Sequence, residues 1–247
     1  MDLGVDDRHY LLTAASRGLG LATAASLARD GAWVTIVARD ATALDRAAAD
    51  LGPRAGIVCA DLSQASSAES ILQALGGQQL DGVLLNVGGP EPGAALNLTD
   101  EQWQAAFDQV VMSSLRLIRA VVPALRPGSC ILLVLSSTVK EPIATLAASN
   151  VLRPGLAMLV KDLSVQLADR GIRVNGILPG RIATDRLLAL TGDDPAGMSE
   201  VSKGIPLGRL GRPDEFGDVA AFLLSPASSY ITGALVPVDG GLLRSPW

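Results

Sequence analysis

The chain has 247 residues, of which 49% are hydrophobic and 18% are charged, and its formal net charge is −5. A chain of this length and composition folds into one large or two small domains and is not disordered. The acidic balance argues against a general nucleic-acid-binding surface, which requires a basic face. The apolar runs reach only about half of the ~18 residues that a membrane-spanning helix needs, and the acidic start of the chain lacks the apolar core of a signal peptide, so we expect a cytoplasmic protein.

Strand-like and helix-like periods of apolar residues alternate along the whole chain. The expected strands are Tyr10–Ala14, Trp33–Ala38, Gly56–Ala60, Asp81–Val87, Cys130–Leu135, Ile172–Leu178 and Ala234–Val238. The expected helices are Gly18–Asp30, Ala41–Leu51, Gln64–Leu75, Asp100–Leu125, one that ends near Arg170, and Asp214–Leu224. Strands that are apolar on both faces and alternate with helices predict a parallel sheet covered by helices on both sides, in a single α/β domain.

Three features stand apart from this alternation. The polar stretch Gly180–Pro213 follows the carboxyl end of a strand, where open α/β sheets bind ligands, and we expect it to be a substrate lid or loop. Cys59 and Cys130 lie in strand-like runs and are expected to be buried free thiols. The single histidine, His9, lies at the start of the first strand, and we interpret it as structural, which argues against a multi-histidine metal site.

A glycine-containing loop, "TAASRGLG" (Thr13–Gly20), joins the first strand to the first helix. Gly18 and Gly20 allow a tight turn and close packing, so that the N–H groups and dipole at the helix N-terminus can bind a pyrophosphate. The alternative is a plain strand–helix turn. Ala14 stands where related loops carry their first glycine, and its Cβ would crowd the approach of a cofactor to the backbone.

The end of the second strand, "VARD", indicates which dinucleotide the loop would take. An acidic residue here holds a free ribose 2′-hydroxyl, whereas a 2′-phosphate needs a guanidinium. Arg39 at this position and Arg17 in the glycine-containing loop favour NADP(H) over NAD(H). Asp40 is the competing ribose ligand, but one position later it is expected to cap the next helix.

Polar residues and glycines also follow the third and fourth strands at the same edge of the sheet. Asp61 and Asn86 could line the adenine and the ribose, while Gly88 and Gly89 let the chain pass close to a ligand. The alternative for each of these residues is that it only shapes its loop.

Motifs along nearly the whole chain resemble those of the short-chain dehydrogenase/reductase superfamily, with a layout similar to 3-oxoacyl-[acyl-carrier-protein] reductases. The matching pieces are "TAASRGLG", "CADLS", "LLNVGG", "LVLSS", "RVNGILPGRIAT", "GRLGRPDEF" and "SSYITGALVPVDGG". The resemblance implies a Rossmann-like, doubly wound sheet of about seven strands, a nicotinamide cofactor, a small carbonyl substrate and a homotetramer or homodimer. With the residues discussed above, it implies a cofactor site made of Thr13, Ala15, Ser16, Arg17, Gly18, Leu19, Gly20, Arg39, Asp61, Leu62, Asn86, Gly88, Pro179, Gly180, Ile182 and Thr184.

The catalytic residues of that family are mostly replaced. Members use a tyrosine as proton donor, a lysine four residues later, a serine that orients the carbonyl, and an asparagine on the long helix. Aligned outward from the motifs, Ser149 takes the tyrosine position, Arg153 the lysine position and Val110 the asparagine position, and only the serine is kept, as Ser137. No realignment restores the pair, because alanines lie four residues after both tyrosines of the chain.

The helix that should carry Ser149 and Arg153 contains Pro154 and Gly155 in its first turns. A proline inside a helix lacks the N–H and clashes with the preceding turn. We therefore expect the helix to begin later, with Ser149 and Asn150 in a cap or loop.

Lys140 is the only lysine near the predicted site and could act as a general acid if burial lowers its pKa. The alternative is a loop ion pair between Lys140 and Glu141. An arginine at position 153 can stabilise an oxyanion, but it does not readily release a proton. Three functions stay open: an NADP(H)-dependent carbonyl reductase with an atypical site, a catalytically degenerate dinucleotide-binding homologue with a structural or sensing role, and non-redox chemistry in the same pocket.

Overall fold

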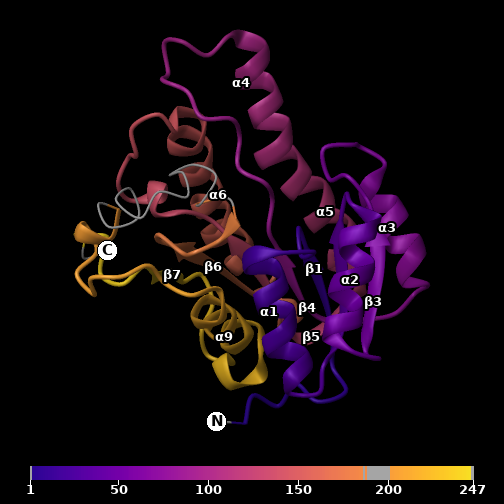
Figure 1. Ribbon diagram of the computed structural model, residues 1–247. Helices are drawn as coiled ribbons and strands as arrows, with labels where there is room; N and C mark the ends of the chain where they lie inside the picture. Colours follow the sequence, from indigo (N-terminus) through magenta and orange to yellow (C-terminus); the bar gives the residue numbers. More distant parts are fainter. Residues whose placement is uncertain (1, 186, 188–200, 246–247) are drawn as a thin grey trace.

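The computed structural model describes residues 2–185, 187 and 201–245. Its centre is a seven-stranded sheet in the order β3-β2-β1-β4-β5-β6-β7, in which all neighbours are parallel. The strands are β1 (His9–Thr13), β2 (Trp33–Ala38), β3 (Ala55–Cys59), β4 (Leu80–Leu85), β5 (Leu125–Val134), β6 (Arg173–Pro179) and β7 (Leu235–Val238). The predicted doubly wound, Rossmann-like α/β fold is confirmed (Figure 1).

Helices cover both faces of this sheet. They are α1 (Gly18–Arg29), α2 (Ala41–Leu51), α3 (Ser67–Leu75), α4 (Asp100–Phe107), α5 (Ser113–Val121), α6 (Ala147–Gln166) and α9 (Pro213–Leu224). Side chains alternate across a strand, so Leu11 and Leu12 belong to different core clusters. Leu11 packs in the cluster under α3, α5 and α6, whereas Leu12 packs in the cluster under α1, α2 and α9.

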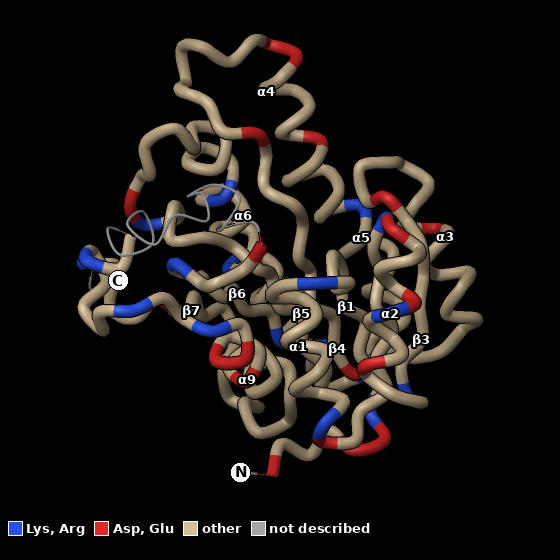
Figure 2. The backbone as a smooth tube through the Cα atoms, viewed as in Figure 1, with Lys and Arg blue, Asp and Glu red and all other residues tan. Residues whose placement is uncertain are grey.

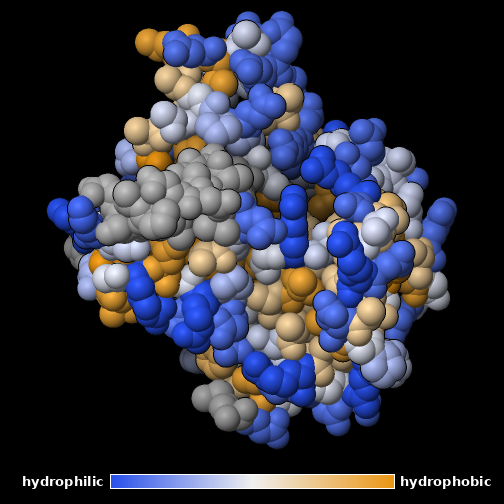
Figure 3. Space-filling view, in the orientation of Figure 1, coloured by the Kyte–Doolittle hydropathy of each residue, from blue (hydrophilic) through white to orange (hydrophobic). Residues whose placement is uncertain are grey.

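The long helix expected over Asp100–Leu125 is continuous but not uniform. A capping box starts it: Thr99 Oγ1 accepts from Gln102 N at 3.3 Å, and Gln102 Oε1 accepts from Thr99 N at 2.9 Å. A π-helical segment, Asp108–Met112, separates α4 from α5, and such segments are frequent at functional sites. Figure 1 shows α4 projecting beyond the sheet, and Figure 3 shows hydrophilic residues along its visible face.

Two element bounds correct the expectations. The fifth strand begins at Leu125 and not at Cys130, and its pairing with β4 shifts register between Leu80 and Gly82. Helix α6 begins at Ala147 and runs through Pro154, so Ser149 and Asn150 lie in its first turn and not in a loop before it. The helix tolerates the proline because Leu156, Ala157 and Val160 on the same helix are buried against the sheet, and this burial offsets the lost hydrogen bond.

One of the two cysteines also departs from expectation. Cys130 is buried and free as predicted, but Cys59 is exposed. The reason is its strand: β3 is an edge strand of the sheet, and one face of it lies in solvent. His9 is buried in β1 with its Nε2 atom 2.8 Å from Thr35 Oγ1, which confirms its structural role. Among the described residues, no helix has the length and apolar character needed to cross a membrane.

Candidate active site

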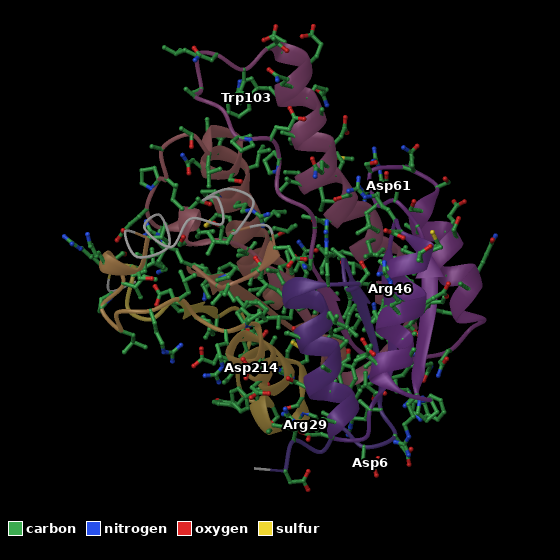
Figure 4. The ribbon with its side chains drawn as sticks, viewed as in Figure 1. Asp6, Arg29, Arg46, Asp61, Trp103 and Asp214 are labelled. Carbon is green, nitrogen blue, oxygen red and sulfur yellow. The ribbon has the colours of Figure 1, made fainter. Side chains whose placement is uncertain are left out.

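The carboxyl ends of the strands carry the candidate site. Figure 4 places Asp61, which follows β3, toward this edge, whereas Asp6 and Arg29 lie at the opposite end of the molecule. Because the sheet is parallel, the loops after β1, β2, β4, β5 and β6 all reach the same edge.

The loop between β1 and α1 is shaped by close packing. Gly20 cannot carry a side chain, because a Cβ there would lie 2.6 Å from the carbonyl oxygen of Ala14. Gly18 has a φ of +58°, and a Cβ there would lie 3.7 Å from Thr184 Cγ2. Arg17 precedes α1 in an extended conformation, and its side chain makes no capping hydrogen bond. In the described chain, the first N–H groups of α1 are therefore free of a side-chain cap and suited to an anion.

Ala14 explains why related loops prefer glycine at this point. Its φ is +47°, in the left-handed region that a Cβ disfavours. Ala14 is also one of the three described non-glycine residues with a positive φ. The loop therefore keeps the conformation of a glycine at a cost of about 1–2 kcal/mol.

The end of β2 separates an arginine from an aspartate. Asp40 Oδ1 accepts a hydrogen bond from Ala43 N at 3.0 Å, so its carboxylate caps α2 as expected. The Arg39 side chain is exposed, and it forms no ion pair or hydrogen bond in the described part of the chain. Arg17 is exposed as well.

The loop after β3 supports the loop-shaping alternative for Asp61. Its Oδ1 accepts from Ser63 N at 3.0 Å and from Ser63 Oγ at 2.9 Å, which forms a local turn. Leu62 is half-buried against the core cluster under α3, α5 and α6.

The loop after β4 is held from two sides. Thr13 Oγ1 donates to Asn86 O at 2.7 Å and accepts from Asn86 N at 2.9 Å. Gln109 Nε2, from the π-helical segment, donates to Gly88 O at 3.3 Å. Sequence reasoning missed Gln109, since nothing in the linear pattern places a helical glutamine against a glycine twenty-one residues earlier.

The chain after β6 packs tightly against the chain after β7. Gly180 N donates to Val238 O at 2.9 Å, and a Cβ at Gly180 would lie 2.6 Å from Asp239 Cα. Ile182 is buried, and Thr184 approaches Gly18. The predicted lid, Gly180–Pro213, lies partly outside the described residues, which omit 186 and 188–200.

The turn that contains Ser137 lies against the start of the helix that contains Ser149. Ser137 opens a single 3-10 turn, Ser137–Val139, directly after β5, and both serines are buried. Thr138 Oγ1 lies 3.5 Å from Ser149 O, which joins this turn to the first turn of α6.

Arg153 points to the end of β5. Its Nη1 atom donates to Val134 O at 3.0 Å and to Leu135 O at 3.1 Å, and the residue is only 6% exposed. The guanidinium therefore fixes the strand end that leads into Ser136 and Ser137, which is a positioning role.

Lys140 and Glu141 do not pair with each other, contrary to the ion-pair alternative. Within the described residues, Glu141 Oε1 accepts instead from Arg244 N at 2.7 Å and from Ser245 N at 3.2 Å. Lys140 is half-buried, one turn from Ser137.

Neither tyrosine is placed to donate a proton at this site, and the position of the family's asparagine is taken by a buried valine. Tyr10 is fully buried in β1, in the core cluster under α1, α2 and α9, and burial raises the pKa of its phenol. The Tyr230 side chain is fully exposed. Val110 is buried in the π-helical segment, and its carbonyl oxygen accepts from Ser114 Oγ at 2.7 Å. In the described part of the chain, no cluster of three or more histidine, cysteine or acidic residues could hold a metal ion.

Comparison with known proteins identifies this arrangement. The family model described as enoyl-(acyl carrier protein) reductase matches residues 13–243. This chain belongs to the short-chain dehydrogenase/reductase family. It is 34% identical over 250 residues to dehydrogenase/reductase SDR family member 4 of Bos taurus, which covers 97% of this chain and 88% of the relative.

Solved structures of the family match along nearly the whole fold. L-sorbose reductase from Gluconobacter frateurii, complexed with NADPH and L-sorbose, superimposes with a TM-score of 0.93 at 29% identity, covering 99% of this chain and 100% of that one. A short-chain oxidoreductase from Pseudomonas aeruginosa PAO1, described as containing an atypical catalytic centre, has a TM-score of 0.89 at 30% identity, covering 96% and 98%. This family member is thus similar both to an NADPH-bound reductase and to a relative with an atypical centre.

Proposed function

We propose that this short-chain dehydrogenase/reductase uses NADP(H) to reduce a small carbonyl compound, of the 3-oxoacyl or ketone type, with an atypical proton donor. The observation that carries the proposal is the difference between the roles of the two charged residues that follow β2. Both residues are exposed, but Asp40 is engaged as the cap of α2, which leaves Arg39 as the charge at the strand end without a side-chain partner in the described part of the chain. A guanidinium suits a 2′-phosphate, and a free carboxylate would suit the 2′-hydroxyl of NAD(H).

The remaining residues fit such a cofactor. The uncapped N-terminus of α1 would take the pyrophosphate, and Arg17 with Arg39 would take the 2′-phosphate. The loop of Pro179, Gly180, Ile182 and Thr184 would contact the nicotinamide half. When bound, NADPH supplies the hydride that reduces the carbonyl carbon. The likeness to the NADPH-bound L-sorbose reductase supports this assignment.

The proton must come from a group other than tyrosine. Ser137 Oγ would orient the carbonyl, and Lys140 Nζ would donate a proton to the carbonyl oxygen as the alcohol forms. Lys140 suits this role because the neighbouring carboxylate of Glu141 is held by the amides of Arg244 and Ser245. Arg153 would hold Ser137 in position indirectly, because its guanidinium bonds the carbonyls of Val134 and Leu135 at the end of the strand that leads into Ser137.

Direct binding tests the cofactor. Isothermal titration should give tighter binding of NADPH than of NADH, and Arg39→Glu should weaken NADPH binding about 10- to 100-fold, because charge-assisted hydrogen bonds to a phosphate are lost. Arg119→Glu is the matched control, since Arg119 is an exposed arginine on α5 whose side chain, in the part of the chain that the structure describes, bonds only Leu115 O of its own helix. Equal affinity for both dinucleotides, or no effect of Arg39→Glu, would contradict the assignment.

Turnover tests the proton donor. NADPH oxidation is followed with 3-oxoacyl thioesters and small ketones, for the unchanged chain and for Lys140→Met and Lys140→Arg. General acid catalysis contributes about 10²–10⁴-fold, so Lys140→Met should lower kcat by about that factor. Lys140→Arg keeps the charge without a readily released proton and should be equally slow. If the arginine variant keeps the activity, Lys140 acts only as a charge.

A second function is favoured by the way two groups are engaged. The guanidinium of Arg153 bonds the end of β5, and Ser114 occupies the carbonyl of Val110. Both arrangements suit a homologue that binds the dinucleotide without turnover. NADPH binding with no oxidation across the substrate panel would establish this alternative.

A row of exposed apolar residues on α6 suggests a surface for assembly with other copies of the chain. Val151, Met158 and Val165 are spaced seven residues apart on one face, and they are 61%, 70% and 77% exposed. Phe107, at the end of α4, is a further exposed apolar residue. We propose that these helices pair with a second copy of the chain, as part of a homodimer or homotetramer.

A further inference from the structure

The residues after β7 form an ordered turn and not a loose end. We call residues 239–245 the C-terminal segment. Asp239 holds it, because its Oδ1 accepts from Gly241 N at 2.9 Å and its Oδ2 accepts from Leu243 N at 2.8 Å. The side chain of Leu243 packs against the core cluster under α3, α5 and α6.

The C-terminal segment lies directly against the chain after β6. A Cβ at Gly180 would lie 2.6 Å from Asp239 Cα, so the two backbones touch. Gly240 O accepts from Leu207 N at 3.2 Å. The segment is therefore packed against Gly180, in the loop proposed to contact the nicotinamide half of the cofactor, and against Leu207.

A single carboxylate joins the C-terminal segment to the turn that carries Ser137. We call residues 137–141 the Ser137 turn. Ser137 O accepts from Lys140 N at 3.0 Å and from Glu141 N at 3.1 Å, which makes the turn compact. The carboxylate of Glu141 then accepts from the amides of Arg244 and Ser245. Two backbone amides bonded to an ionised carboxylate form a strong contact, because hydrogen bonds to charged groups are the stronger ones.

Charge supports this assignment of Glu141. In the described part of the chain Glu141 has no ion pair, although Lys140 precedes it and Arg244 lies beside it. Figure 2 shows several Lys and Arg positions around the C-terminal end of the chain. The carboxylate bonds backbone amides instead, and a backbone contact fixes the position of the chain whatever side chains are present.

We propose that Glu141 is a positioning residue, whose carboxylate fixes the C-terminal segment against the Ser137 turn. Held together in this way, the two segments select which carbonyl substrates reach Ser137. The selection of substrates rests on the proposed function. The joining of the two segments does not, because it is a property of the described contacts alone.

The joining is tested by amide hydrogen exchange on the full chain, on Glu141→Ala, on Glu141→Gln and on a chain truncated after Leu243. Glu141→Ala should speed exchange at the amides of Arg244 and Ser245 by about tenfold or more, the factor that corresponds to one charged hydrogen bond. The truncation should in turn speed exchange at the amides of residues 140 and 141. Glu141→Gln keeps an acceptor oxygen and should lie between. Glu69→Ala, which removes an exposed glutamate from α3, is the control and should change none of these rates.

Selection is tested by steady-state kinetics on the same variants. Glu141→Ala and the truncation should each raise KM for the carbonyl substrate by about tenfold, with the NADPH affinity unchanged within about twofold. Combining the two changes should add nothing further, because Glu141 acts through the segment that the truncation removes.

Three results would overturn the proposal. Unchanged exchange at residues 140 and 141 in the truncated chain would show that the segment does not hold the turn. Effects of Glu141→Ala that multiply with those of the truncation would show that Glu141 acts by another route. An equal loss of NADPH affinity would indicate a general structural defect. If the unchanged chain turns over no substrate, the proposed function fails, and the exchange rates still decide whether the two segments are joined.

Discussion

Arg173 offers the sharpest test of what stabilises the packing of β6 against the end of α9. It begins β6 and is only 7% exposed, and its guanidinium reaches the end of α9. Nη1 donates to Leu223 O at 3.0 Å and to Ile231 O at 3.2 Å, while Nη2 donates to Ser225 O at 2.9 Å and, more weakly, to Leu224 O at 3.5 Å. A buried cation here satisfies the last carbonyls of the helix and lies at the negative end of its dipole.

The cost of Arg173→Met can be worked from the partners that remain. Leu223 O keeps the single hydroxyl donor of Ser228, at 2.9 Å, Ser225 O keeps Ser228 N at 3.3 Å, and Ile231 O keeps Asn175 Nδ2 at 2.9 Å. The variant therefore loses three good charge-assisted bonds without leaving those three carbonyls unpaired. At about 1.5–3 kcal/mol per charged bond, reduced because the guanidinium no longer has to be buried, we expect a loss of about 3–4 kcal/mol.

Equilibrium unfolding in urea measures this loss, and the melting temperature should fall by about 10 °C for a domain of this size. Arg170→Met is the matched control. Arg170 is an exposed arginine whose side chain makes one hydrogen bond within the described residues, from Nη2 to Val122 O at 2.9 Å, and its loss should cost less than about 1 kcal/mol. If Arg173→Met costs no more than Arg170→Met, then the four carbonyl contacts do not stabilise the end of α9, and the reasoning is wrong.

Three further predictions concern single positions. Ala14→Gly should raise the free energy of unfolding by about 0.5–1 kcal/mol, because relief of the positive φ exceeds the added freedom of glycine in the unfolded chain, whereas Ala15→Gly, at a buried neighbour, should lower it; thermal melts compare the two. Tyr10→Phe should leave stability unchanged or higher and activity intact, since the buried hydroxyl has no partner in the described chain. Because burial raises the pKa of Tyr10, the phenolate absorbance of the unchanged chain should match that of Tyr10→Phe up to about pH 11, and stability should fall above about pH 10, where only the unfolded chain ionises that residue. Met158→Glu on the exposed face of α6 should convert the proposed homodimer or homotetramer to monomers in light scattering, and an unchanged mass would contradict the proposed interface.

Local patterns in the sequence were enough for much of the fold. The alternation of apolar periods predicted seven strands in a parallel sheet with helices on both sides, because strands that are apolar on both faces must be covered on both faces. Asp40 was expected to cap α2, and it does so, because a cap depends on only three residues of neighbouring chain. Gly18 and Gly20 were expected in a tight turn, which their packing confirms.

Patterns failed where a distant contact decided the outcome. Pro154 predicted a late helix start, but burial of one face of α6 against the sheet keeps the helix intact around it. An ion pair between Glu141 and its neighbour Lys140 was one of two alternatives, yet the Glu141 carboxylate bonds backbone about a hundred residues later. Exposure of Cys59 depended on β3 being an edge strand, which the run of residues itself does not reveal.

In the candidate site, too, some features follow from neighbouring residues in the sequence and others depend on contacts between distant elements. The sequence by itself determined that a glycine-containing loop joins the first strand to the first helix and that the chain has no Tyr-x-x-x-Lys pair, because both facts concern residues that are close together in the chain. Only the tertiary structure decided what Arg153, Glu141 and Gln109 do. Each of these side chains bonds backbone from another element, and the free energy of such a bond depends on where the fold brings the two groups, not on their spacing along the chain.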